Sequence, residues 1–183
     1  MKPILTNSEM VRAILEGRKT VTRRVVKPQP EPDYAAVSGM YRDSNGHLCA
    51  ICHSCAGGIH AVYPPCDRGD ILWVRETWSR METGQYLYKA DNEKPLSFLG
   101  WRPSIHMPRE AARIFLRVID IRADRLQELT LRDAEMEGMD PRGPMFTDFV
   151  RIWDSTIKPK DIPTYGWDTN PWVWVIEFER INK

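Results

Sequence analysis

The sequence predicts a single α+β domain, residues 1–183, with a small β-barrel core, short flanking helices and one irregular insertion. Three observations favour this fold class. The length fits one domain. Segments with strand patterns are dispersed among short segments with helical patterns, which is typical of α+β proteins. The C-terminal segment 172–180, WVWVIEFER, is apolar on both faces, as expected of a strand buried in a barrel.

The first predicted element is a short amphipathic helix over residues 7–16. Thr6 and Glu9 have the spacing of a capping box, and the apolar residues that follow recur at helical intervals. Gly17 suits the position just after the helix. A valine-rich strand is predicted next, over residues 20–26.

Three further segments predict strands. Residues 70–78, DILWVRETW, are apolar at nearly every position before Arg75 and Glu76. Residues 86–90 predict a weaker strand, and residues 112–122 alternate between apolar and polar. An ionisable pair inside so apolar a segment indicates an internal salt bridge, part of a site, or side chains that point to solvent.

Two helices are predicted in the last third of the chain. Thr130 can cap a helix that ends at Glu137, immediately before Gly138. The apolar residues between 146 and 157 have helical spacing. By its position alone, Glu137 would be an ordinary solvent-exposed side chain at the end of a short helix.

The segment of about residues 28–68 differs from the rest in composition. It contains five prolines and a stretch rich in glycine, serine and cysteine. We predict an irregular insertion with room for one short hairpin, rather than a second domain. Because a structureless loop of this length is unusual in a compact domain, we expect something to hold it together.

Four cysteines in the insertion are the candidates for this role: Cys49, Cys52, Cys55 and Cys66. Disulfides are rare in the cytosol, so these residues are free thiols or metal ligands. Four thiolates would form a tetrahedral structural zinc site, in which His47, His53 or His60 could replace one ligand. The alternative is a loop with unpaired cysteines.

The charge distribution argues against a protein that binds long polyanions. The net charge is only +1, yet the first 30 residues hold seven Lys/Arg and two Glu. A local basic patch of this kind suits one phosphate or a short strand. We find no Walker motif, dinucleotide-binding glycine loop or G-x-S-x-G elbow, which disfavours hydride-transfer and phosphoryl-transfer enzymes.

No apolar run reaches the ~18 residues that a membrane-spanning helix needs. The N-terminal segment MKPILTNSEM lacks the apolar region of a signal peptide. We therefore expect a cytoplasmic protein.

The block GRKTVTRR, residues 17–24, places two hydroxyls and four cations directly after the first helix. Arginine can fork onto a phosphate, and a buried lysine can lose its proton. This block is a candidate site. The alternative is a charged strand edge that faces solvent.

The segment WRPSIHMPR, residues 101–109, combines aromatic, basic and proline residues. Its two prolines predict a rigid loop rather than a helix. Trp101 and His106 are suited to stack on a base, and Arg102 and Arg109 to bind phosphate. The alternative is a turn of the barrel in which His106 is merely hydrogen-bonded.

In this order, the motifs resemble those of ASCH-domain proteins of phage and prophage type. The resemblance rests on a helix followed by GRKTxTRR, then GDxLWVRETW, WRPSIHMPR, a helix with EGM, and the terminal NPWVWVIEFERI. It covers most of the chain outside residues 28–66. The resemblance implies a PUA-like β-barrel with a cleft for RNA or nucleosides.

Small bacterial members of this family are acetylcytidine amidohydrolases, which have a catalytic lysine, threonine and glutamate. The resemblance assigns these roles to Lys19 and Thr22 in GRKTVT and to Glu137 in AEMEGM. After the second threonine those enzymes carry an apolar residue and one arginine, whereas this chain carries Arg23 and Arg24. In a regular strand Lys19 and Thr22 would face opposite sides, so the backbone must turn near residues 19–20.

Three hypotheses follow. The first is an amide hydrolase for an acylated nucleobase or nucleoside that needs no cofactor. Thr22 would be the nucleophile or hold the attacking water, Lys19 the base or oxyanion stabiliser, and Glu137 the proton shuttle. The second is a non-catalytic RNA or nucleotide reader. The third is a zinc-stapled interaction protein whose contact surface is residues 40–66.

The candidate ligand-binding residues shared by the first two hypotheses are Arg23, Arg24, Arg75, Glu76, Trp101, Arg102, Ser104, His106 and Arg109.

Overall fold

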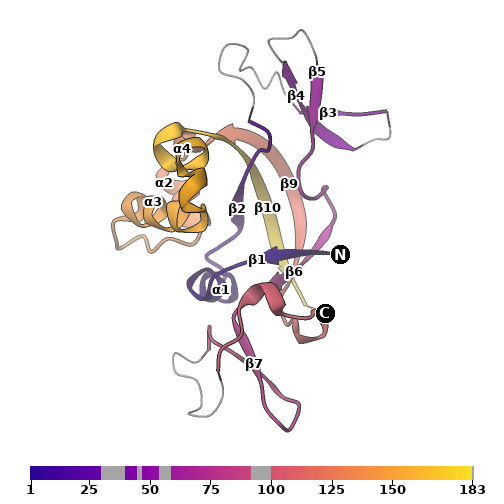
Figure 1. Cartoon of the computed structure of the whole chain (residues 1–183), viewed down its shortest axis with the longest axis vertical. Coiled ribbons are helices and arrows are strands. Elements are labelled where there is room, and N and C mark those ends of the chain that lie inside the picture. The colour runs from indigo at the N-terminus through magenta and orange to yellow at the C-terminus, as the bar shows by residue number, and fades with distance from the viewer. Residues whose placement is uncertain (30–39, 45–46, 54–58, 92–99, 183) are drawn as a thin grey trace.

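The structure is a computed structural model that describes residues 1–29, 40–44, 47–53, 59–91 and 100–182 (Figure 1). These residues form a mixed α+β fold, which confirms the predicted class. The largest sheet has the strand order β1-β6-β9-β10-β2. Its strands are β1 (Lys2–Leu5), β6 (Ile71–Arg75), β9 (Phe115–Arg125), β10 (Trp172–Ile181) and β2 (Val21–Val25). Only the β1–β6 pair is parallel within this sheet.

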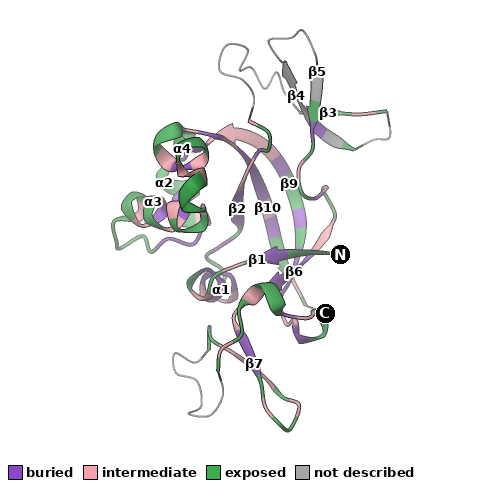
Figure 2. Ribbon diagram, in the orientation of Figure 1, coloured by how far each residue is buried: buried purple, intermediate pink, exposed green. Residues whose placement is uncertain are grey.

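The strand β10 is buried on both faces, as its sequence predicts. Trp174, Ile176 and Phe178 belong to one hydrophobic cluster, together with side chains of β6 and β9. Val173 and Val175 point the other way and belong to a second cluster. Figure 2 shows the buried residues concentrated along these central strands.

The edges of this sheet are not joined by a backbone ladder among the described strands, since β1 and β2 end the strand order. A side chain crosses between them instead. The Nη2 atom of Arg24 in β2 donates a hydrogen bond to the carbonyl of Leu5 in β1, at 3.0 Å. The observed sheet is therefore open in its strand pairing.

The helix α1 (Ser8–Leu15) connects these two edge strands. Its cap is Asn7, whose side chain accepts a hydrogen bond from the backbone N–H of Met10 at 2.8 Å. The cap therefore lies one residue after the predicted Thr6. Gly17 follows the helix with a φ of 78°, as expected of a residue that ends a helix.

The remaining helices pack together on one side of the sheet (Figure 1). They are α2 (Leu131–Met136), α3 (Met145–Thr156) and α4 (Ile162–Tyr165). Thr130 caps α2 as predicted, because its hydroxyl accepts from the backbone N–H of Asp133. Phe149 and Trp153 of α3 lie in the same hydrophobic cluster as Val173 and Val175, so α3 covers one face of β10.

Two smaller sheets project from this body (Figure 1). The insertion forms an antiparallel sheet of β3 (Met40–Arg42), β4 (Leu48–His53) and β5 (Ile59–Val62), which is more regular than the single hairpin predicted there. The hairpin of β7 (Trp78–Arg80) and β8 (Tyr86–Tyr88) forms the other.

The single strand predicted over residues 70–78 is two strands. It breaks after Arg75, where the backbone N–H of Glu76 donates to the sulfur of Met107 at 3.2 Å. Trp78 then exchanges backbone hydrogen bonds with Arg102. Among the described residues, no helix combines the length and apolar character that crossing a membrane would require.

Candidate functional site

A pocket of about 580 Å³ lies where the two edge strands face each other. One side of its lining comes from Leu5 and the residues after β1, and another comes from β2. The polar lining residues are Thr6, Asn7, Lys19, Thr22, Arg23, Arg24, Lys27, Thr77, Ser104, Thr156 and Glu137. The pocket therefore lies at the open side of the sheet, and many of its lining residues are polar.

The backbone before β2 is irregular and directs Lys19 toward the end of α2. The N–H of Lys19 donates to the carbonyl of Ala13, and the N–H of Thr20 donates to the carbonyl of Met136, at 2.8 Å. The carbonyl of Thr20 accepts from Phe178 of β10, at 2.9 Å. Since β2 begins only at Val21, the strand geometry that would separate Lys19 from Thr22 does not apply.

The amine of Lys19 is buried, with 6% of the residue exposed. Its Nζ donates to the carbonyl of Val21 at 2.7 Å, to the carbonyl of Glu137 at 2.9 Å, and to Glu137 Oε2 at 2.5 Å. These three acceptors match the three donors of an ammonium group. Burial lowers the pKa of Lys19 below its ordinary value of 10.5; Glu137 opposes this shift, while Arg24 and Arg23 add to it.

The carboxylate of Glu137 is buried as well, with 5% of the residue exposed, and does not point to solvent as its helix-end position alone predicted. Gly138 makes this possible. Its φ is 96°, and a Cβ atom there would lie 2.7 Å from the Cβ of Ala13 and 3.1 Å from the Cβ of Lys19. Only glycine lets the end of α2 approach α1 and Lys19 this closely.

The second carboxylate oxygen of Glu137, Oε1, forms a salt bridge with Arg23. Nη1 of Arg23 lies 3.1 Å from Glu137 Oε1, and its Nη2 lies 3.4 Å from Asp133 Oδ1. Although burial acts to raise it, hydrogen bonds with Thr130 and the charge of Arg23 hold the pKa of Asp133 below its ordinary value of 3.8. Glu137 is thus held between two different cations, one on each oxygen.

Thr22 lines the same pocket and is also buried. Its Oγ1 accepts a hydrogen bond from Nη1 of Arg24, at 2.8 Å. Within the described part of the chain, neither Lys19 nor Glu137 hydrogen-bonds this hydroxyl. Because a guanidinium stabilises negative charge on a neighbouring oxygen, Arg24 would favour charge that develops on Oγ1.

The apolar lining residues come mainly from α3 and its neighbours. They are Met10, Met139, Phe149, Ile152, Trp153 and Ile157, besides Leu5 and Val25 of the edge strands. The rings of Phe149 and Trp153 are 6.3 Å apart and nearly parallel. The helical spacing of residues 146–157 predicted this apolar face, but nothing local indicated that it borders a polar cluster. No local pattern indicated Lys27 either, although it lines the pocket. Its Nζ lies 4.6 Å from the ring centre of Tyr165.

Of the 101–109 segment, only Ser104 contributes to this pocket. The guanidinium of Arg102 lies over the ring of Trp78, at 5.2 Å. His106 is exposed, and the indole N–H of Trp101 is buried without a hydrogen-bond partner among the described residues. Arg109 lines a different pocket. The structure therefore does not bring the predicted stacking residues to Lys19.

The Arg75–Glu76 pair also lies outside this lining. Glu76 forms an internal salt bridge, in which Arg113 donates to both of its oxygens at 2.8 and 2.9 Å. Burial raises the pKa of Glu76, against the effect of Arg113. Arg75 donates to the carbonyl of Met107 at 3.1 Å.

The cysteine cluster lies partly outside the described residues. Cys49 and Cys66 are buried free thiols. Cys55 and the side chain of Cys52 are not described. Burial raises the pKa of the Cys66 thiol to about 11, so without a bound metal this thiol is protonated at neutral pH. No group of three potential metal ligands occurs among the described residues, and the zinc site stays a prediction.

No protein-family model matches the chain, and neither a curated protein nor a solved structure matches it.

Proposed function

We propose that the 580 Å³ pocket binds an acylated nucleobase or nucleoside and hydrolyses its amide bond. The observation that carries this proposal is the buried pair of Lys19 and Glu137, with Nζ and Oε2 2.5 Å apart. A lysine with a lowered pKa, a carboxylate in contact with it and a hydroxyl in the same pocket are the groups that amide hydrolysis by general acid–base chemistry requires.

The reaction uses Lys19 as a neutral amine. An amine donates only two hydrogen bonds and has a lone pair, so it can accept the proton of Thr22 or of a water that Thr22 holds. The oxygen attacks the acyl carbon, and Arg24 stabilises the resulting negative charge. Lys19 then returns the proton, by way of Glu137, to the leaving exocyclic nitrogen as the C–N bond breaks. If Thr22 carries the acyl group, water releases it as the acid.

The mixed lining of the pocket suits a nucleobase. A base has apolar faces and a polar edge, and here α3 contributes mainly apolar side chains while β2 contributes Arg23 and Arg24. Binding pockets for small molecules occupy about 300–1,000 Å³, and this one is within that range. A nucleoside is thus a better match than a long duplex, which agrees with the nearly neutral charge of the chain.

We also propose that the open sheet is an ASCH-type, PUA-like barrel whose closure is made by side chains. The hydrogen bond from Arg24 to the carbonyl of Leu5 supports this, because it spans the two edges that a ladder would join in a closed barrel.

A non-catalytic reader of RNA or nucleotides would need the cations and the apolar lining only. It gives no reason to bury Lys19 against Glu137, since an unpaired surface lysine binds phosphate without the cost of desolvation. The buried pair therefore favours the hydrolase.

The test is turnover of N4-acetylcytidine by the purified protein, followed by chromatography of the product cytidine. We expect kcat/KM to fall about 10³-fold in the Lys19→Met variant. Arg142→Ala, at a highly exposed position outside the pocket, is the control. The substrates tested are acetylated cytidine, adenosine and guanosine. If the wild type turns over none of them faster than Lys19→Met does, the hydrolase is rejected and the non-catalytic RNA or nucleotide reader remains.

A further inference from the structure

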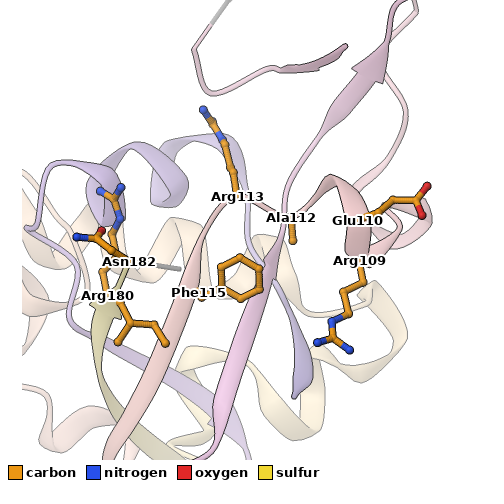
Figure 3. A pocket seen from close by; sticks show the side chains of 8 residues that line it. Arg109, Glu110, Ala112, Arg113, Phe115, Arg180 and Asn182 are labelled. Atoms are coloured by element: carbon orange, nitrogen blue, oxygen red, sulfur yellow. The ribbon is translucent and has the colours of Figure 1, made fainter. Parts of the chain in front are cut away.

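A second pocket, of about 650 Å³, lies beside the start of β9 and the end of β10 (Figure 3). Three arginines line it: Arg109 and Arg113 come from the stretch before β9, and Arg180 comes from β10. Figure 3 shows the ring of Phe115 between Arg109 on one side and Arg180 on the other. Glu110 is the single acidic residue in the lining, so the pocket is positive.

Two of these arginines are available to a ligand. Arg113 is occupied, because it forms salt bridges with Glu76 and Asp91. Arg109 and Arg180 are exposed and have no carboxylate partner among the described residues. Arg109 contacts the sulfur of Met1 at 3.3 Å, and Arg180 donates a long hydrogen bond of 3.4 Å to the carbonyl of Leu15.

One rigid segment connects the two pockets. Ser104 lines the first pocket and Arg109 lines the second. Between them Met107 is fully buried, and its carbonyl accepts from Arg75 at 3.1 Å, which fixes the segment to β6. The intervening Ile105 is 54% exposed. The segment therefore links the two pockets, with Ile105 and His106 exposed between them.

The strand β1 runs between the same two places and gives their separation. Met1 contacts Arg109 at the second pocket, and Leu5 lines the first. From Met1 to Leu5 the chain advances four residues, or about 13 Å at the rise of a strand. At about 3.4 Å per stacked nucleotide, roughly four nucleotides cover this distance, and fewer do when the strand is extended.

We propose that the substrate is a single-stranded nucleic acid: its acylated base enters the first pocket while Arg109 and Arg180, on the two sides of Phe115, bind two phosphodiesters of nearby nucleotides. A guanidinium forks onto phosphate oxygens, and the exposed Ile105 and His106 are available to contact the intervening bases. The assignment of the base to the first pocket rests on the proposed function; the second site is testable without it.

The binding arm uses fluorescently labelled single strands of six nucleotides, one RNA and one DNA, without an acyl group, between 50 and 200 mM salt. Replacing both residues, Arg109→Ala with Arg180→Ala, should lower affinity about 10-fold at low salt. It should also reduce the slope of log K against log salt by about 1.4, since each phosphate contact contributes about 0.7 for single strands. The RNA and DNA arms show whether the 2′-hydroxyl is also recognised.

The matched control is Arg142→Ala with Arg151→Ala, which removes the same charge from two exposed positions outside both pockets. It should keep the affinity and the salt slope of the wild type. Thermal unfolding of both double variants checks that they fold. Equal binding by the wild type and the Arg109/Arg180 variant would overturn the proposal.

The catalytic arm compares N4-acetylcytidine alone with the same residue inside a six-nucleotide strand. In the Arg109/Arg180 variant, kcat/KM should fall about 10-fold further for the strand than for the nucleoside. Turnover of the nucleoside by a protein that does not bind strands rejects this inference and keeps the proposed function. Arginine-dependent strand binding without any hydrolysis rejects the proposed function and keeps the phosphodiester site.

Discussion

Two glutamates, Glu76 and Glu137, are alike in burial and in having an arginine partner. They are 1% and 5% exposed, and each is paired with an arginine. They differ in the second partner. Arg113 takes both oxygens of Glu76 and lies 3.9 Å from the ring centre of Tyr88. In Glu137, by contrast, one carboxylate oxygen accepts from Arg23 and the other accepts from Lys19.

In the proposed function, this difference separates a structural charge pair from a catalytic one. Arginine keeps its proton in proteins, so the cation of the Glu76 pair has a fixed charge. Lysine can lose its proton when buried, and burial lowers the pKa of Lys19, which is what the proposed proton transfer requires. Glu76 also lines neither of the two pockets described. Burial of a carboxylate is therefore not enough to identify a site; its neighbours decide.

The strongest test of this difference removes the same charge at both positions. Glu137→Gln should lower kcat on N4-acetylcytidine about 10³-fold, because the proton shuttle is lost. Glu76→Gln should leave kcat of the folded protein within about 3-fold of the wild type. Glu137→Gln should lose about 3 kcal/mol of stability, because it leaves the buried Lys19 without a carboxylate partner. Glu76→Gln should lose less, because Arg113 keeps its salt bridge with Asp91.

The measurement is steady-state kinetics at a temperature where both variants are folded, with urea unfolding of each. If Glu76→Gln loses as much kcat as Glu137→Gln, the distinction between the two pairs is wrong.

A smaller effect is expected from the backbone that positions Glu137. Gly138→Ala combines strain at a positive φ with contacts of 2.7 Å to Ala13 and 3.1 Å to Lys19. It should cost about 3 kcal/mol of unfolding free energy and also lower kcat, because Lys19 is displaced.

The control is Gly69→Ala, whose φ of 88° is similar but whose Cβ would meet nothing within 4 Å. It should cost about 1 kcal/mol and leave kcat intact. Equal losses of stability in the two variants, by urea unfolding, would show that the close approach at Gly138 has no energetic role.

The smallest effect concerns pH. Because the folded-state pKa of Lys19 lies below its ordinary 10.5, the unfolded chain binds one more proton between these two values. Stability should therefore rise with pH across that window, by up to about 1.36 kcal/mol per unit, and stay level below the folded pKa, where the folded and the unfolded chain both bind the proton.

Lys19→Met should lack this slope, whereas Arg113→Met should keep it. Urea unfolding at intervals between pH 7 and pH 10.5 measures it. Identical slopes in the wild type and Lys19→Met would mean that Lys19 stays protonated, and it could not then be the base.

The local elements of the fold could be predicted from sequence because their signals are local. Thr130 caps α2 and Gly17 follows α1 at the predicted positions. The two-sided burial of β10 follows from its unbroken apolar pattern. The break after Arg75 could not be predicted, because it depends on Met107, which is 31 residues away from Glu76.

The candidate site was less accessible to local patterns. Lys19 and Glu137 are separated by 118 residues, and nothing near either residue indicates the other. Only the resemblance to ASCH-domain proteins singled out Glu137. The two glycines adjacent to the site were read as helix ends, which is correct for both, but the pattern could not show that Gly138 also removes a clash with Lys19.

The hydrogen bonds of Arg24 have a mechanical consequence. The same guanidinium holds the hydroxyl of Thr22 and the carbonyl of Leu5. Any molecule that pushes the two edge strands apart must therefore pull on, or release, the hydroxyl as well. Opening of the cavity and orientation of the Thr22 hydroxyl are coupled through one side chain, so a ligand that separates the strands also changes how this hydroxyl is held.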